Sequence, residues 1–325
     1  MIVLKEQILA LLAQHDGYIS GQALAQALGV SRQAVWKGVR ALKDSGCEIE
    51  STPNKGYRLT ALPAYLNEIA IRRHLHTAVL GKSLVVLDAV GSTNDYLKRM
   101  GADGCENGTV VTTREQVAGK GRLGRSWASK RDENLAFSIL LRPQLAPKDA
   151  TPITPLAGLA ICKTLRKTTG LDCKIKWPND VIIGSKKLVG ILTEMSAEFD
   201  AVEYIVTGIG VNVDQTEFPE EIAHKATSVL LETGTRFDKN RLLAALLDGL
   251  EKAFTRYNLS LPPDALEEYT SLCATIGRTV SFQKGTRTLS GTAVEINADG
   301  ELRVMLQDGS IRTVNSGEVT VQGIY

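Results

Sequence analysis

The chain has 325 residues, in which 38 lysines and arginines nearly balance 36 aspartates and glutamates, leaving a formal net charge of +2. This balance excludes a protein that coats nucleic acid through its overall charge, so any basic surface must be local. The length predicts two or three domains. The five cysteines form no C-x-x-C pair, and no apolar run reaches about 18 residues. We therefore expect reduced thiols and a soluble, cytoplasmic protein without a membrane segment.

The segment 1–62 has the pattern of a separate helical unit. Apolar residues at helical spacing mark a first helix from Leu4 onward. Ser20 can cap a short second helix that ends near Gly29, and Ser31 can cap a third that runs to about Asp44. A short helix, a glycine turn and a capped helix are the layout of a helix-turn-helix.

One face of the third helix is polar and includes an aromatic side chain. It carries Arg32, Gln33, Trp36, Lys37 and Arg40. A tryptophan exposed among cations is unfavourable unless the surface has a use, so we predict DNA binding over an ordinary solvated helix or a protein-only module. Residues 47–59 then read as strand, turn and strand, and Lys55 in the turn could contact a phosphate. The whole predicts a winged helix-turn-helix.

Residues 63–273 read as a mixture of helices and strands. Helices are expected near 67–76, 153–168, 239–257 and 262–272, and strands near 84–90, 108–113, 134–142, 173–177, 181–184, 188–195 and 202–211. Strands 181–184 and 188–195 flank Gly-Ser-Lys-Lys, which is a hairpin signal. Such hairpins favour a mixed sheet over a doubly wound dinucleotide-binding domain.

The segment from Gly119 to Trp127 is rich in glycine and basic residues. It fits the G-x-G-x-x-G pattern of dinucleotide-binding domains, but the amphipathic helix that should follow this pattern is absent from the sequence. It is not a P-loop either, because Lys120 is followed by Gly121 and not by Ser or Thr. Five lysines and arginines, and no acid, lie between Gly119 and Arg131. Exposed amides and cations suit a loop that wraps a phosphate arriving with the substrate. The alternative is a solvated basic surface loop.

Further polar clusters lie at the ends of predicted strands, where loops carry function. Ser92, Thr93 and Asn94 could hold a small polar ring or merely cap the next helix. The pair Asn179 and Asp180 could read a base edge or hold a metal, although Pro-Asn-Asp is also ordinary turn chemistry. The other candidate site residues in these clusters are Gln116, Lys187 and Asn212.

Taken in order, these motifs are specific. The run Gly-Ser-Thr-Asn, Gln-x-Ala-Gly-Lys-Gly-Arg-x-Gly-Arg-x-Trp, Lys-Trp-Pro-Asn-Asp, Lys-Leu-x-Gly-Ile-Leu and Gly-x-Gly-x-Asn resembles the biotin–protein ligases. With its N-terminal module, the chain is similar to the bifunctional type that also represses the biotin operon. The resemblance implies an α+β protein with a winged helix-turn-helix at 1–62, a mixed-sheet ligase domain at 63–273 and a small SH3-like barrel at 274–325.

The resemblance also implies an activity: biotin reacts with ATP, accompanied by Mg²⁺, to form biotinyl-5′-AMP, and biotin then passes to a lysine of a biotin carboxyl carrier domain. Arg122 and Lys187 would be the catalytic cations. The biotin contacts would be Ser92, Thr93, Asn94, Gln116, Lys120, Gly121, Arg122 and Lys187. The ATP contacts would be Arg122, Arg125, Trp127, Asn179, Asp180 and Asn212, with Asp180 also a metal contact.

The same resemblance implies operator DNA as a second partner and a homodimer when the adenylate is bound. Two rival interpretations are a ligand-sensing DNA-binding regulator without ligase activity and a lipoate–protein ligase. Two positions depart from the family. Lys120 stands where many relatives have arginine, which keeps the charge without the forked geometry, and Gln322 stands where some relatives have arginine.

Overall fold

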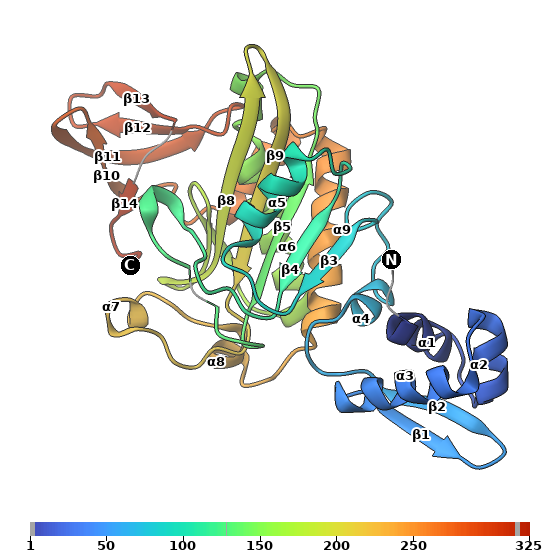
Figure 1. Ribbon diagram of the computed structural model, residues 1–325. Helices are drawn as coiled ribbons and strands as arrows, with labels where there is room; N and C mark the ends of the chain where they lie inside the picture. Colours follow the sequence, from blue (N-terminus) through green and yellow to red (C-terminus); the bar gives the residue numbers. More distant parts are fainter. Residues whose placement is uncertain (1–3, 128, 316–318) are drawn as a thin grey trace. The chain divides into compact units, whose positions relative to one another are not determined.

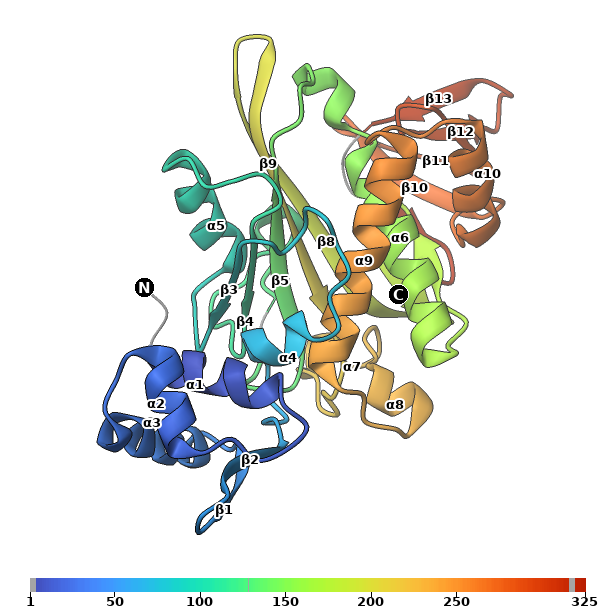
Figure 2. The ribbon, with the colours of Figure 1, turned by 90° about the vertical axis from the view of Figure 1, so that its right-hand side faces the viewer.

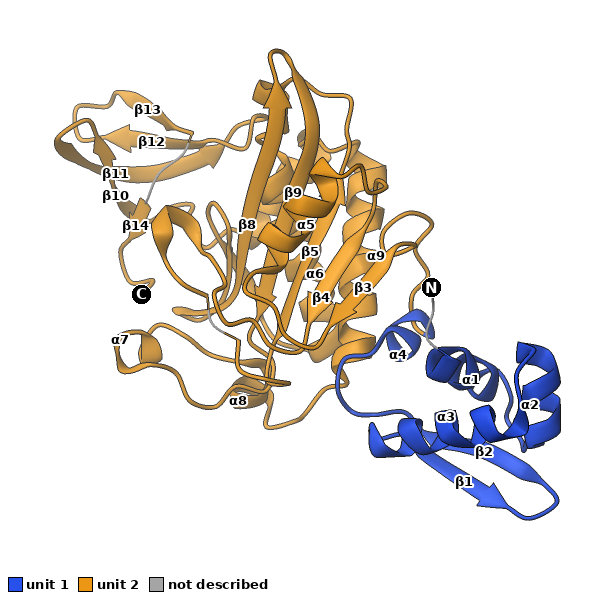
Figure 3. Ribbon diagram, in the orientation of Figure 1, with its two compact units in different colours: residues 1–73 blue, residues 74–325 orange. Residues whose placement is uncertain are grey.

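The computed structural model describes residues 4–127, 129–315 and 319–325. The chain forms two compact units, residues 1–73 and 74–325, which Figure 3 shows in different colours. Each unit has a hydrophobic core of its own. The predicted domain limits at 62/63 and 273/274 do not coincide with this division and stay predictions.

The N-terminal unit contains three helices, a hairpin and a short helix. The elements are α1 (Leu4–Ala13), α2 (Gly21–Leu28), α3 (Arg32–Asp44), β1 (Glu48–Thr52), β2 (Gly56–Ala61) and α4 (Glu68–Arg72). Ser20 accepts a hydrogen bond from the backbone N–H of Ala23, and Ser31 accepts one from Ala34, so both predicted caps are confirmed. The antiparallel pair β1–β2 completes the predicted winged helix-turn-helix.

A seven-stranded mixed sheet is the centre of the larger unit (Figure 1). Its strands are, in spatial order, β3 (Leu84–Leu87), β4 (Val110–Thr113), β5 (Leu135–Leu141), β9 (Ala201–Val211), β8 (Lys186–Glu198), β7 (Asp180–Ile183) and β6 (Lys174–Lys176). β3 and β4 are parallel, and the other pairings are antiparallel. The predicted mixed sheet is therefore confirmed.

Helices cover both faces of this sheet. α6 (Ile153–Thr169) and α9 (Lys239–Tyr257) pack together on one side, while α5 (Thr93–Ala102) lies on the other against β4, β5 and β9 (Figure 2). The remaining helices are α7 (Glu220–Ala223), α8 (Val229–Thr233) and α10 (Pro263–Leu272). The long helix α9 begins and ends where the sequence predicts, because Asp238 caps its start and Asn258 adopts the left-handed conformation at its end.

The C-terminal strands form a second sheet that is joined to the first through a tryptophan. They are, in spatial order, β13 (Ile311–Val314), β12 (Leu302–Leu306), β11 (Arg287–Ile296), β10 (Thr279–Lys284) and β14 (Val319–Val321). Their pairings are antiparallel, as the predicted SH3-like barrel requires. The buried Trp177 donates its indole N–H to the carbonyl of Gly300 at 2.9 Å, and its backbone N–H to the Thr275 hydroxyl at 3.0 Å.

One predicted helix is shorter than its pattern. The helix expected near 67–76 is α4, which ends at Arg72. Beyond it the backbone N–H groups of His76, Val79 and Leu80 donate to carboxylates on α9 instead of to helical carbonyls. Those carboxylates lie far away in the sequence, so local periodicity could not reveal them. Strand β8 is longer than the strand expected near 188–195, because its pairing with β9 continues to Glu198.

Candidate active site

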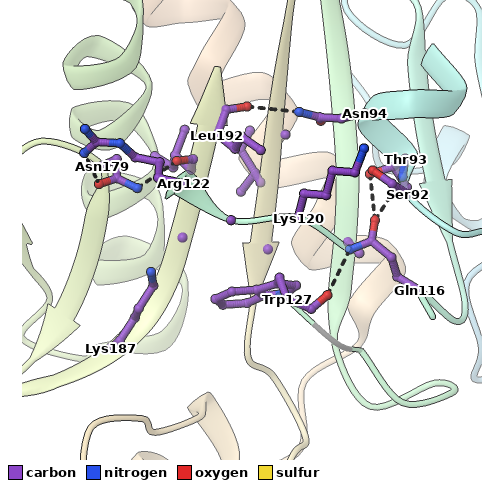
Figure 4. Close-up of a pocket in the computed structure, with 17 residues that line it drawn as sticks. Ser92, Thr93, Asn94, Gln116, Lys120, Arg122, Trp127, Asn179, Lys187 and Leu192 are labelled. Carbon is purple, nitrogen blue, oxygen red and sulfur yellow. Dashed lines mark hydrogen bonds between the residues drawn. The ribbon is translucent and has the colours of Figure 1, made fainter. Parts of the chain in front are cut away.

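The polar clusters and the basic loop meet in one pocket of the larger unit. Its walls are the start of α5, the loop 116–127 and the strands β8 and β9 (Figure 4). The predicted residues that line it are Ser92, Thr93, Asn94, Gln116, Lys120, Gly121, Arg122, Trp127, Asn179 and Lys187. Three other predicted residues, Arg125, Asp180 and Asn212, lie outside this lining.

Buried polar groups form one end of the pocket. Ser92 Oγ accepts a hydrogen bond from the backbone N–H three residues on, so it caps α5 and lines the pocket at the same time. Gln116 Oε1 accepts from the backbone N–H of Thr93 at 2.9 Å and lies 3.2 Å from its hydroxyl. The Ser138 hydroxyl lies 2.8 Å from Thr93 Oγ1 and 2.6 Å from Asn94 Oδ1. Because these groups hold one another, this end is preformed.

Glycines in β8 and β9 make room for the pocket's side chains. A Cβ on Gly208 would lie 2.1 Å from Asn94 Oδ1, and one on Gly210 would lie 2.3 Å from Trp127 Cε2. Gly190 is less tight, because its Cβ would lie 3.1 Å from Trp127 Cζ3. These glycines belong to the motifs Lys-Leu-x-Gly-Ile-Leu and Gly-x-Gly-x-Asn, but they were not among the predicted site residues. The available signal was a glycine inside a strand, which marks a close approach of another group.

The basic loop folds back on itself as a narrow hairpin. The Trp127 N–H donates to the Gly119 carbonyl at 2.8 Å, and the Gly121 N–H donates to the Arg125 carbonyl at 2.7 Å. Leu123 at the turn has φ 56° and is 69% exposed. The loop thus presents its cations to the pocket while an apolar side chain at its tip stays in solvent.

Two cations of the loop are held at opposite sides of the pocket. Lys120 Nζ lies 2.7 Å from Asp95 Oδ2, and the hydrogen bond from Lys120 is the largest influence that lowers the pKa of that carboxyl. Arg122 Nη1 donates to Asn179 Oδ1 at 3.1 Å, and burial lowers the pKa of its guanidinium. An anion in the pocket would be favoured by these charges, which water screens only in part.

A third cation, Lys187, belongs to a cluster with Asp180, Tyr325 and Lys176, of which only Lys187 and Asp180 were predicted site residues. Lys187 Nζ lies 2.7 Å from Asp180 Oδ1 and 5.6 Å from the centre of the Trp127 ring. The other oxygen of Asp180 accepts a hydrogen bond from Tyr325, the last residue of the chain. Lys176 Nζ lies 3.8 Å from the centre of the Tyr325 ring. Burial is the largest influence that lowers the pKa of Lys176 to about 8; the charge of Asp180 opposes it, and that of Lys187 adds to it.

Asn212 was predicted to contact ATP, and Asp180 was predicted to contact ATP and a metal ion. Asn212 is buried and donates its side-chain N–H to the Thr227 carbonyl at 3.0 Å, which ties the end of β9 to the segment that follows α7. Within the described ranges, no group of three or more His, Cys, Asp or Glu side chains is arranged to hold a metal ion. Asp180 is a carboxylate beside the pocket, and Lys187 and Tyr325 contact it.

The predicted DNA-binding residues are all exposed in the N-terminal unit. Arg32, Gln33, Trp36, Lys37 and Arg40 are all exposed on α3. Trp36 is 51% exposed, and the Arg40 guanidinium lies 5.7 Å from the centre of its ring. Lys55 is exposed in the turn between β1 and β2. An exposed aromatic side chain stacked with a cation is an arrangement suited to contacts with nucleic acid.

Comparison with known proteins places both units. Residues 86–212 match the biotin/lipoate A/B protein ligase family, residues 5–58 match a helix-turn-helix domain, and residues 275–321 match the biotin protein ligase C-terminal domain. No helix among the described residues is long and apolar enough to cross a membrane.

Relatives match nearly the whole chain. The bifunctional ligase/repressor BirA of Bacillus subtilis is 35% identical over 97% of this chain and 98% of its own length. The protein of the same name from Escherichia coli is 31% identical over 97% and 96%. The biotin protein ligase of Aquifex aeolicus, solved with biotin and ATP, is 29% identical, with a TM-score of 0.62 over 74% of this chain and 99% of that one. The chain therefore belongs to the biotin–protein ligase family, in the bifunctional ligase/repressor group that carries an N-terminal helix-turn-helix domain.

Proposed function

We propose that this chain activates biotin with ATP to form biotinyl-5′-AMP and pyrophosphate, and then transfers biotin to a lysine of a biotin carboxyl carrier domain. The observation that carries the proposal is the single pocket in which a preformed polar end faces a cluster of cations. The polar end suits an uncharged ring such as the biotin head group, and the cations suit phosphates.

In this proposal Ser92, Thr93, Asn94 and Gln116 bind the biotin head group. Their hydrogen bonds to one another hold donors and acceptors in place before the ligand arrives, which limits the ordering entropy that binding must overcome. Gly121 lets the loop backbone approach the ligand. The lining at Ile191, Leu192 and Ile209 offers apolar contact to the rest of the molecule.

Arg122 and Lys187 carry the chemical step. A biotin carboxylate oxygen attacks the α-phosphorus, the bond to the pyrophosphate oxygen breaks, and pyrophosphate leaves with the electron pair. Two anionic groups must meet, so cations that stabilise the developing charge lower the barrier. Lys120 and Arg125 assist when the loop closes over the product, and closure keeps the mixed anhydride away from water.

The nucleotide occupies the other side of the pocket. Trp127 packs beside the adenine, with Asn179 and Asn212 as polar contacts. Asp180 would be the carboxylate that contacts Mg²⁺, which would offset the charge of the ATP phosphates. Asp180 pairs with Lys187, so this contact would require Lys187 to turn from Asp180 toward the phosphate.

Mass spectrometry of the bound ligand tests the activity. After incubation with biotin, ATP and Mg²⁺, we expect the mass of biotinyl-5′-AMP on the protein and, after addition of a carrier domain, the biotinylated carrier. Lipoate in place of biotin is the matched control. Adenylate formed with lipoate alone would favour a lipoate–protein ligase, and no adenylate with either acid would favour a ligand-sensing regulator.

The exposed face of α3 supports a second function. We propose that Arg32, Gln33, Trp36, Lys37, Arg40 and Lys55 contact operator DNA, and that the chain represses biotin genes as a homodimer when the adenylate is bound. One winged helix offers few phosphate contacts, so a two-fold dimer reading two half-sites would strengthen binding. All five cysteines are free thiols, which suits the reducing cytoplasm where these partners are found.

A further inference from the structure

The last residue of the chain reaches the catalytic sheet. Tyr325 follows β14, and the tail before it is fixed to the barrel: Gln322 N–H donates to the Thr279 carbonyl at 2.9 Å, and the buried Ile324 donates to Val321 at 3.1 Å. The Tyr325 hydroxyl donates to Asp180 Oδ2, across 145 positions of the sequence. The barrel therefore delivers a phenol to the edge of the proposed ATP site.

Asp180 connects this phenol to a proposed catalytic cation. Its Oδ1 lies 2.7 Å from Lys187 Nζ, and its carboxylate is largely buried, at 11% side-chain exposure. Lys187 in turn lines the pocket. Tyr325, Asp180 and Lys187 thus form a continuous chain of contacts from the barrel to the place where the phosphates would bind.

The tyrosine fixes which oxygen of Asp180 is available. While Oδ2 accepts from the phenol, only Oδ1 is left to pair with Lys187, so the ammonium is held through one oxygen and can turn toward a bound phosphate. The phenol is the donor in this bond, because an ionised carboxylate can only accept. Without the phenol a buried carboxylate oxygen would lack its partner, and the carboxylate would turn to bind Lys187 through both oxygens.

We propose that Tyr325 is a positioning residue for adenylate formation, which acts on Lys187 by holding Asp180 in one orientation. The inference rests on the proposed function, because it assigns Lys187 a role at the phosphate. It also gives the C-terminal barrel a specific part in the first half-reaction, through one side chain.

The test is the rate of pyrophosphate release by the full-length Tyr325→Phe variant. This change keeps the ring beside Lys176 and removes only the hydrogen bond. We expect the rate at saturating ATP and biotin to fall about tenfold, the scale of one hydrogen bond to a charged group, with KM for biotin nearly unchanged. Tyr269→Phe is the matched control, because the Tyr269 hydroxyl is buried without a hydrogen-bond partner among the described residues.

A double-mutant cycle separates positioning from a general structural effect. If Tyr325 acts through Asp180, then adding Tyr325→Phe to an Asp180→Ala variant should cause no further loss of rate. Deletion of Tyr325 should be at least as slow as Tyr325→Phe. A parent-like rate for Tyr325→Phe, or equal losses in both backgrounds, would overturn the inference while the parent still forms adenylate. A parent that forms none would instead overturn the proposed function.

Discussion

The indole of Trp127 lies on the backbone of Gly210, so closely that a Cβ on the glycine would come within 2.3 Å of the ring. The end of the basic loop is thereby seated on strand β9. A substitution at Gly210 tests the contact between the Trp127 ring and β9 without changing a charged residue.

We expect Gly210→Ala to displace the indole and weaken adenylate binding by about 1–3 kcal/mol, the usual effect of overpacking a tight contact. Isothermal titration with the adenylate measures it. Gly158→Ala is the control, since its Cβ would meet its nearest neighbour, Ile191 Cδ1, at a comfortable 3.9 Å. Equal affinity of Gly210→Ala and the parent would show that the ring can move away freely.

The effect of the two proposed catalytic cations on adenylate formation should be distinguishable from the effect of the loop on retention of the adenylate. Lys187→Ala and Arg122→Ala should each slow adenylate formation or loosen the adenylate by roughly 2–4 kcal/mol, the scale of one lost electrostatic stabiliser. Arg122→Gly should in addition release activated biotin and label nearby lysines, because the loop would seal less well. Unchanged pyrophosphate release together with an unchanged adenylate off-rate would contradict both assignments.

On the N-terminal unit, Arg40→Ala should weaken operator binding. The loss should be about 1–3 kcal/mol and restricted to certain DNA sequences if Arg40 reads a guanine. Fluorescence anisotropy with operator and scrambled duplexes measures it. Lys5→Ala removes an exposed cation from α1 and should bind as the parent does. A parent-like Arg40→Ala would place the recognition surface elsewhere.

Stability should depend on the proton of Lys176. Its pKa is lowered from 10.5 to about 8 by burial, so above about pH 8 the unfolded chain holds a proton that the folded chain has lost. Stability from this residue therefore rises from about pH 8 to about pH 10. Urea unfolding of Lys176→Met should show less of this rise than the parent, whereas Lys174→Met, whose side chain is 37% exposed, should keep it.

Adenylate and operator DNA should strengthen each other's binding by the same factor, because linkage is reciprocal. The physical route is the loop 115–131, whose glycines become fixed around the bound anion and so allow a defined partner surface. Sedimentation and DNA titrations with biotin alone, ATP alone and both would measure the coupling. Identical dimer populations and operator affinities in all three would mean that the DNA-binding unit responds to another signal.

Local signals in the sequence were enough for most elements. The serine caps at Ser20 and Ser31 and the full length of α9 could be predicted because neighbouring residues determine them. Capping and pocket lining proved not to be alternatives at Ser92, which does both. The order of the motifs along the chain also predicted that the polar and basic residues of the pocket belong to one site.

Contacts between residues far apart in the sequence could not be predicted from such local signals. The backbone N–H groups of His76 and Val79 donate to carboxylates of α9, and nothing in the sequence near residue 76 indicates these contacts. Tyr325 and Lys176 carry no motif that links them, and only the docking of the barrel brings the ring to the ammonium. The tight glycines of β8 and β9 were visible as strand glycines, yet their neighbours could be named only from the fold.

The bond from the Trp177 indole to the Gly300 carbonyl joins the two sheets through a main-chain atom. Gly300 has φ 77°, and a Cβ there would lie 2.9 Å from Pro155 Cγ, so this turn admits little but glycine. Elsewhere on the barrel, side chains can be exchanged without altering this joint. The spacing between the sheets, and with it the reach of Tyr325, therefore depends on the backbone path at Gly300, and a side chain at this one position would alter both.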